Sequence, residues 1–308
     1  MRSATPPSSP RRKRGSGMKN KLSWLAGPYV LWMALVVIVP ILLVVVYAFT
    51  ASGETAADIG GFTLDNFSRM GTYTVIFARS FQLALVATLV CLLIGYPLAY
   101  VMAKEGPGFQ RVAMVIIMLP MWVNFLLRTY AWMAILENNG ILNNFFEAIG
   151  LFSLINSIFG TDISFFPMIR TQGAVVLGMV YNYLPFMVLP IYSVIIKLDH
   201  SLVEAARDLG ASSAGVFRRV TLPLSLPGVL SGVTMVFVPS VSTFAISRMM
   251  GGNNQMLLGN LIEQQFLGGA YNPHLGSAIA LVMMIIVVAC MWIMNRFGEG
   301  EEIGRAHV

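Results

Sequence analysis

Six apolar stretches, each long enough to cross a lipid bilayer, constrain this chain more than any other feature of its sequence. A membrane-spanning helix needs about 20 mostly apolar residues. The stretches that qualify are Pro28–Phe49, Ser80–Ala103, Val112–Leu136, Gly173–Ile196, Leu224–Ile246 and Leu275–Asn295. Only 11% of the 308 residues are charged, against roughly 25% in soluble domains, and the short alternating strands of a transmembrane barrel are absent. We therefore expect an all-α membrane protein with six transmembrane helices.

The distribution of basic residues predicts how these spans are oriented. Six spans place both termini on one side, and that side carries fifteen lysines and arginines, whereas the opposite loops carry four. Because positively charged loops stay in the cytoplasm, both termini are expected to be cytoplasmic. The opposite loops carry seven carboxylates, of which Glu137 and Glu263 are weaker candidates for cation entry. Ordinary solvation is the alternative explanation for these acids.

The two ends of the chain are set aside before the fold is considered. Residues 1–17 are low in complexity and precede a second methionine, Met18, so we expect that they are not native. Residues 302–308, EIGRAHV, back-translate readily into a sequencing adapter and are expected to be an artefact. The predicted organisation is a cytoplasmic segment at 1–27, a transmembrane domain at 28–297 with a cytoplasmic loop at 198–223, and a tail at 298–308.

The sequence lacks the motifs of several functions that are common in membrane proteins. The sequence has no Gly-x-x-x-x-Gly-Lys-[Ser/Thr] phosphate loop, so we expect that this chain does not bind or hydrolyse ATP itself. Its three histidines are scattered without metal-ligand companions. No predicted span contains a carboxylate from which to build a proton relay. These observations disfavour a membrane enzyme or an ion-coupled carrier.

The loop between the fourth and fifth spans, SLVEAARDLGASSAGVFRRVTLP, is polar and helix-like although apolar spans flank it. Ser201 and Glu204 fit a capping box, in which the serine caps the helix and the glutamate reaches back. Asp199 offers another cap one turn earlier. A short helix is expected to end at Gly210, which supplies the left-handed position typical of a helix terminus.

A second short helix, AGVFRRV, is expected to follow in the same loop. Ser212 or Ser213 is its predicted cap. It is expected to stop at Leu222-Pro223, because proline lacks the backbone donor that a continuing helix needs.

The first of these helices has the composition of a docking element. Ala205 and Ala206 are small, so a partner surface can approach the helix backbone closely, and Leu202, Val203 and Leu209 are apolar for a cytosolic loop. One alternative is a hairpin that packs only on its own bundle. A DNA-binding helix-turn-helix is disfavoured, because the loop is tethered between two spans and lacks a surrounding basic surface.

The same loop resembles the "EAA" loop of permease subunits in ATP-binding-cassette importers. The matching residues lie before the penultimate span, at the spacing of that motif: Glu204, Ala205, Ala206, Gly210, Leu222 and Pro223, with Asp208 inside the helix. The resemblance implies that these residues form a coupling helix seated in a groove of a separate ATPase. ATP and Mg²⁺ would then be bound on that partner chain and no cofactor on this one.

The resemblance extends from about Leu64 to Arg296. TLDNFSRM, LVATLVCLLIGYPLAYVMAK, LPMWVNFLLRTYAWMAIL, LPFMVLPIYSVIIKLDHSLVEAARDLGAS and MLLGNLIEQQFL are similar to the B-type permease of spermidine/putrescine importers. This implies a type I importer permease fold in a bacterial cytoplasmic membrane. It also implies a second homologous permease, an ATPase dimer and an extracytoplasmic substrate-binding protein as partners, and no nucleic acid. One departure is ISRMMGG, where Arg248 stands near a position at which relatives often carry an acid.

Polar and aromatic residues in the third and fourth spans are the candidates for the substrate pathway. The third span contributes Trp122, Asn124, Arg128 and Tyr130, and the fourth contributes Tyr181, Asn182 and Tyr183. An arginine inside a span is costly unless it is paired or hydrated, and it would repel a cation, so an organising or gating role is favoured for it. Snorkelling to the outer interface is the alternative. The fourth-span residues can hold an ammonium by cation–π contacts or, alternatively, join helices by hydrogen bonds.

The sequence therefore predicts half of an ATP-driven translocation pathway for a small cationic solute, with polyamines favoured. An importer permease for another solute, such as iron, thiamine or a phosphonate, remains open, because specificity in such systems lies largely in the binding protein. A stand-alone secondary carrier or channel is the alternative from another class, and it predicts transport without an ATPase.

Overall fold

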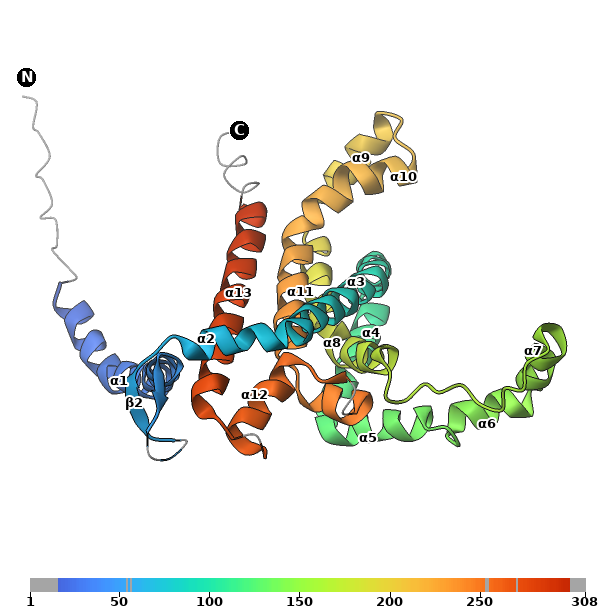
Figure 1. Cartoon of the computed structure of the whole chain (residues 1–308). Coiled ribbons are helices and arrows are strands. Elements are labelled where there is room, and N and C mark those ends of the chain that lie inside the picture. The colour runs from blue at the N-terminus through green and yellow to red at the C-terminus, as the bar shows by residue number, and fades with distance from the viewer. Residues whose placement is uncertain (1–15, 54, 56, 253–254, 270, 300–308) are drawn as a thin grey trace, which may run out of the picture.

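The computed structural model describes residues 16–53, 55, 57–252, 255–269 and 271–299 (Figure 1). The predictions about residues 1–17 and 302–308 fall outside these ranges, apart from residues 16 and 17. The N-terminal half contains α1 (Ser16–Ala48), β1 (Thr50–Ser52), β2 (Ile59–Phe62), α2 (Asp65–Arg69), a 3-10 turn η1 (Met70–Tyr73), α3 (Thr74–Lys104), α4 (Pro107–Trp122), α5 (Phe125–Leu136), α6 (Ile141–Ala148) and α7 (Leu151–Phe159). The rest contains α8 (Gln172–Ile195), α9 (His200–Asp208), α10 (Ser213–Val216), a π-helical turn η2 (Phe217–Thr221), α11 (Leu222–Ser242), a second π-helical turn η3 (Ser247–Gly251), α12 (Leu258–Leu267) and α13 (Pro273–Glu299).

The predicted spans are confirmed for five of the six stretches. Among the described residues, five helices are long and apolar enough to cross a membrane, at Gly27–Ala48, Asp65–Lys104, Gln172–Ile195, Ser213–Ser242 and Pro273–Met294. The third stretch is not a continuous helix. It is broken after Trp122, and the segments on either side of the break are bent by 92°. Counting that bent pair as one span gives six, and the cytoplasmic location of the termini stays a prediction.

The break in the third stretch has a local cause. Pro120 lies in the last turn of α4, and Val123 and Asn124 have extended ψ angles of 142° and 131°. The Asn124 side chain accepts hydrogen bonds from the backbone N–H groups of Leu126 and Leu127, at 2.8 and 3.4 Å. Asn124 is therefore the N-cap of a new helix, α5.

The core of the bundle is formed by α3, α8 and α11, which pack on one another. Helices α8 and α11 approach closely because small residues lie at their crossing. A Cβ at Gly228 would lie 2.9 Å from the Pro190 carbonyl oxygen, and one at Gly232 would lie 3.1 Å from that of Met187. Each of these glycines leaves space that the backbone of α8 occupies.

Helix α1 lies at the side of the bundle and packs on α13 (Figure 1). Most of its apolar side chains are exposed, as at Leu31, Trp32 and Leu42. In water such a surface would be an aggregation hazard, whereas in a bilayer it faces lipid tails of the same polarity. The exposure therefore agrees with a membrane-spanning role.

A small antiparallel hairpin, β1–β2, follows α1 and is an addition to the all-helical expectation. Asn66 ties it to the bundle by donating to the carbonyl oxygens of Ala48 and Thr50, at 3.1 and 3.0 Å. The buried His274 ring lies against the same region, with its nitrogens 3.0 Å from the Tyr47 carbonyl oxygen and 3.1 Å from that of Asp58. These contacts join the start of α13 to the end of α1.

The loop after the third stretch contains two short helices, α6 and α7. They are separated at Gly150, whose φ of 74° favours glycine. Both extend away from the bundle at the end opposite to α9 and α10, and α12 lies at that same end (Figure 1). The molecule therefore has two opposite ends outside the bundle, one formed by α9 and α10 and the other by α5–α7, η3 and α12.

Candidate functional site

The predicted docking helix is α9, and its cap differs from the one expected. Asp199 is the N-cap residue, and its carboxylate accepts from the backbone N–H of Ser201 at 2.9 Å. The predicted capping box of Ser201 and Glu204 is therefore wrong, because the helix begins one residue before Ser201. Asp199 was the other predicted cap, and it is confirmed.

The end of α9 is the one that the sequence predicted. Gly210 has a φ of 82°, and its N–H donates to the Arg207 carbonyl oxygen at 2.8 Å. The N–H of Ala211 donates to the Ala206 carbonyl oxygen at 3.0 Å. This pair of bonds closes the helix in a left-handed C-terminal motif.

The surface of α9 is open to solvent and partly apolar. Leu209 is 89% exposed and Leu202 is 47% exposed, while Glu204, Ala205 and Asp208 are also exposed. A recess of about 290 Å³ lies between α9 and the following helix, lined by Ala206, Leu209, Gly210, Ala211, Gly215, Arg219 and Val220. An apolar side chain that is almost fully exposed beside a recess is the kind of surface that a partner covers.

The sequence predicted that the second helix of the loop stops at Leu222-Pro223. In the structure it continues past these residues. It begins at the Ser212 cap, which accepts from the Gly215 N–H at 3.2 Å, and it runs through η2 into α11. In the wider π-helical turn the N–H of Leu222 donates to the Phe217 carbonyl oxygen. This wider turn directly precedes Pro223, whose ring and missing N–H would interrupt a continuous α-helix.

Phe217 joins this second helix to the bundle, a role that sequence reasoning missed. Its ring makes edge contacts with the rings of Tyr96 and Tyr100 on α3, at centroid distances of 5.8 and 5.2 Å. The Tyr96 hydroxyl lies 2.8 Å from the Ser225 Oγ on α11. The aromatic residue between the polar loop and the span was the available signal. As a result α10 and η2 are fixed to α3, whereas α9 projects from them.

Two of the predicted pathway residues meet. The Arg128 guanidinium lies 6.0 Å from the centre of the Tyr181 ring, and Trp132 packs edge-on against that ring at 5.4 Å. The Nε atom of Arg128 is buried and has no hydrogen-bond partner among the described residues. Arg128 and Tyr181 thus form a cation–π pair between α5 and α8.

The other predicted pathway residues point elsewhere. Asn124 caps α5, and Trp122 and Tyr130 are 75% and 58% exposed. Asn182 is buried and donates to the Gly178 carbonyl oxygen of its own helix at 2.8 Å, and the Tyr183 hydroxyl donates to the Pro239 carbonyl oxygen on α11 at 3.5 Å. Successive helical residues face different directions, so these seven residues do not form one cluster.

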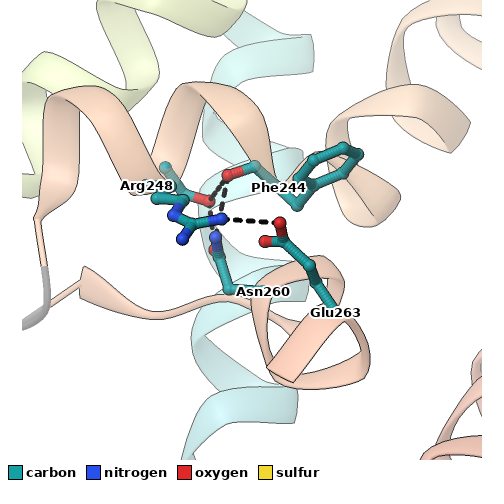
Figure 2. Close-up of polar contacts among 5 residues, drawn as sticks. Phe244, Arg248, Asn260 and Glu263 are labelled. Atoms are coloured by element: carbon teal, nitrogen blue, oxygen red, sulfur yellow. Dashed lines mark hydrogen bonds and ion pairs between the residues drawn. The ribbon is translucent and has the colours of Figure 1, made fainter. Parts of the chain in front are cut away.

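At the opposite end of the molecule, η3 and α12 are joined by a polar network (Figure 2). Arg248 and Glu263 form an ion pair, with 2.6 Å between Nη1 and Oε1. Beside it, the buried Asn260 side chain donates to the Phe244 carbonyl oxygen at 2.8 Å and accepts a short hydrogen bond from Ser247. The network places charged side chains at the end of the molecule that is remote from α9.

Comparison with known proteins identifies the family of this chain. Residues 95–299 match the family of the binding-protein-dependent transport system inner membrane component. The chain belongs to this family. Its members are permeases of multi-pass inner-membrane transport systems, so this chain is a transport subunit.

Relatives of this permease are similar along most of their length. The spermidine/putrescine transport system permease protein PotB of Escherichia coli K12 is 36% identical over 258 residues, which cover 83% of this chain and 90% of the relative. PotB of Haemophilus influenzae is 34% identical over 267 residues, covering 86% and 90%. The molybdenum transport system permease protein ModB of Mycobacterium bovis is 28% identical over 225 residues, covering 73% and 78%.

Two solved structures share the fold of this permease. A bacterial ABC transporter involved in the import of the acidic polysaccharide alginate matches with a TM-score of 0.69 at 16% identity, covering 92% of this chain and 97% of the other. The MetNI methionine ABC transporter matches with a TM-score of 0.55 at 20% identity, covering 76% and 97%. The fold is therefore that of a type I ABC importer permease.

Proposed function

We propose that this permease forms half of the translocation pathway of an ATP-driven polyamine importer, with spermidine and putrescine as substrates. The observation that carries the proposal is the 34–36% identity to spermidine/putrescine permeases, which runs through nine-tenths of those relatives' length. The predicted partners are an ATPase dimer in the cytoplasm, a second homologous permease and an extracytoplasmic binding protein. ATP and Mg²⁺ would be bound on the ATPase.

The exposed helix α9 supports the coupling part of the proposal. Glu204, Ala205, Ala206 and Asp208 lie on a helix with defined caps at both ends, and Leu209 is free to enter a groove. A short capped helix moves as a rigid body, so closure of the ATPase dimer would displace α9 as a unit. Phe217 would pass that displacement to α3, because its ring packs on Tyr96 and Tyr100.

Transport then follows from two states of the bundle, inward-open and outward-open. Nucleotide on the ATPase would bias the equilibrium at one end, and the docked binding protein would bias it at the other. The 92° bend between α4 and the segment beginning at α5 places Arg128 and Tyr181 where two helices meet. We assign this pair an organising role, because an arginine repels a cationic substrate.

A permease for another small solute is the second candidate, supported by the 28% identity to the molybdenum permease ModB. The test that separates the two is uptake of labelled putrescine and spermidine by the complete complex, reconstituted in liposomes with ATP inside. We expect saturable, ATP-dependent uptake of at least one amine and none of molybdate. Absence of any saturable signal with either amine would remove the polyamine proposal.

A further inference from the structure

Arg248 lies between two cavities at the end of the molecule that is opposite to α9. A cavity of about 180 Å³ is lined by Arg248, Gly252, Met256, Asn260, Glu263, Gln264, Leu267 and Gly268. A second cavity, of about 460 Å³, is lined by Met133, Glu137, Ile169, Arg170, Arg248, Met249, Gly251 and Gly252. Arg248 is the charged residue that the two linings share, and each lining contains one carboxylate, Glu263 in the smaller cavity and Glu137 in the larger.

The two partners of the Arg248–Glu263 ion pair differ in their exposure to solvent. The Arg248 side chain is 68% exposed, whereas that of Glu263 is 21% exposed. Ion pairs with an exposed partner contribute little to stability, because water and salt compete for the exposed charge. The arginine is therefore the partner that can leave, and the carboxylate is the one that stays in place.

The surrounding framework does not depend on this ion pair. Asn260 holds α12 to the preceding segment through Phe244 and Ser247, and its Oδ1 also accepts from the Leu257 N–H at 3.3 Å. Figure 2 shows the ion pair lying beside this amide network, with the Glu263 carboxylate facing the guanidinium. The backbone of α12 that carries Glu263 is consequently held whether or not Arg248 is bound to the carboxylate.

We propose that Glu263 binds an ammonium group of the incoming cationic substrate in exchange for Arg248, whose guanidinium occupies the site until the substrate arrives. The inference rests on the proposed function. Carboxylates bind ammonium and guanidinium groups by the same charge-assisted hydrogen bonds, so one replaces the other without leaving a buried charge. Displacement of Arg248 also removes a side chain that lines both cavities.

A linear diamine fits this arrangement better than a single cation. Once Arg248 has moved, the joined space has one carboxylate in each part, Glu263 and Glu137, and a substrate with two ammonium groups pairs with both. With Arg248 in place, the four charged side chains of the two linings, which include Arg170, balance to zero. The two cavities therefore have an excess of negative charge, which attracts cations, only while substrate has displaced Arg248.

The test is the maximal rate of ATP-dependent spermidine uptake by the reconstituted complex, at saturating substrate-loaded binding protein. Glu263→Gln is expected to lower the rate about tenfold, since it removes a charge-assisted bond to the substrate. Arg248→Gln is expected to equal or exceed the wild-type rate, because it removes a competitor. Arg248→Lys keeps a competing positive charge, so its rate should not exceed that of Arg248→Gln, and Asp162→Asn is the matched control, an exposed carboxylate in neither lining.

An ion pair that only stabilises the fold gives the opposite pattern. Arg248→Gln and Glu263→Gln would then lose activity equally, because each breaks the same bond, and that result would overturn the exchange. The exchange predicts that the double variant stays as low as Glu263→Gln. If the complex with Glu263→Gln fails to assemble, the uptake rates of Arg248→Gln and Arg248→Lys are compared with that of the wild type. A rate below wild type in Arg248→Gln refutes the proposal. A wild-type complex that transports neither amine instead refutes the proposed function.

Discussion

The two opposite ends of this permease, α9–α10 and η3–α12, are built in different ways. The α9 end is defined by short-range contacts, because its caps, Asp199 and Gly210, lie within a few residues of the helix they terminate. The η3–α12 end is assembled from separate segments, with Arg248 and Glu263 fifteen positions apart and Leu258 held by a hydrogen bond from its N–H to Ser80 on α3. One end is a rigid helix projecting from the bundle, and the other is a network that needs the folded bundle around it.

This difference fits the tasks proposed for the two ends. A part that receives force from a partner has to keep its own shape while the rest rearranges, and short-range caps provide that. A part that admits substrate has to change its contacts, and an exposed ion pair beside a fixed amide network allows one bond to exchange while the framework stays.

The largest effect is expected from Gly210→Pro. Proline cannot adopt a φ of 82°, and it removes the N–H that donates to Arg207, a combined cost of about 3 kcal/mol or more to the end of α9. We expect uptake to fall to background while ATP hydrolysis continues, as measured in the same liposomes. Gly210→Asn is the control, since asparagine tolerates this conformation. Wild-type uptake by the proline variant would refute the coupling role.

An intermediate effect is expected at the opposite end from Asn260→Ala. The substitution removes the amide that donates to the Phe244 carbonyl oxygen and leaves the buried Leu257 N–H without the Asn260 Oδ1 acceptor, which costs about 1–3 kcal/mol. The matched change is Glu263→Gln, which breaks only the exposed ion pair and costs less than about 1 kcal/mol. Thermal unfolding of the purified complex measures both. Equal losses of Tm would show that the ion pair belongs to the framework, contrary to the comparison.

The smallest effect is expected from Asp199→Ala at the start of α9. Loss of this cap costs about 1 kcal/mol and frees the Ser201 N–H, so hydrogen exchange of the first α9 amides should accelerate. Ser201→Ala should leave that exchange unchanged, because the Ser201 side chain does not cap the helix. Faster exchange in Ser201→Ala than in Asp199→Ala would restore the capping box that the sequence suggested.

The third span shows where sequence reasoning stopped short. Hydropathy continues across Trp122 and Asn124, so a window of about 20 residues reports one span. The signals of a break were present, with Pro120 ending one helix and Asn124 capping the next, but each is tolerated inside a membrane helix when neighbours satisfy the backbone. These local signals cause the break, and the 92° angle between its two sides accompanies the packing of α4 on α3 and α8 and of α5 on α8 and η3.

The sequence by itself determined the membrane class, five of the spans and the limits of α9, because hydropathy, a cap carboxylate and a left-handed glycine act over a few residues. The Tyr181-Asn182-Tyr183 run was predicted either to hold an ammonium or to join helices, and the structure sends its three side chains to α5, to its own helix and to α11, so Tyr183 joins two helices. The Arg248–Glu263 pair and the Phe217 contacts were likewise decided by tertiary structure. These contacts depend on which helix faces lie opposite one another, and that follows from the packing of the whole bundle.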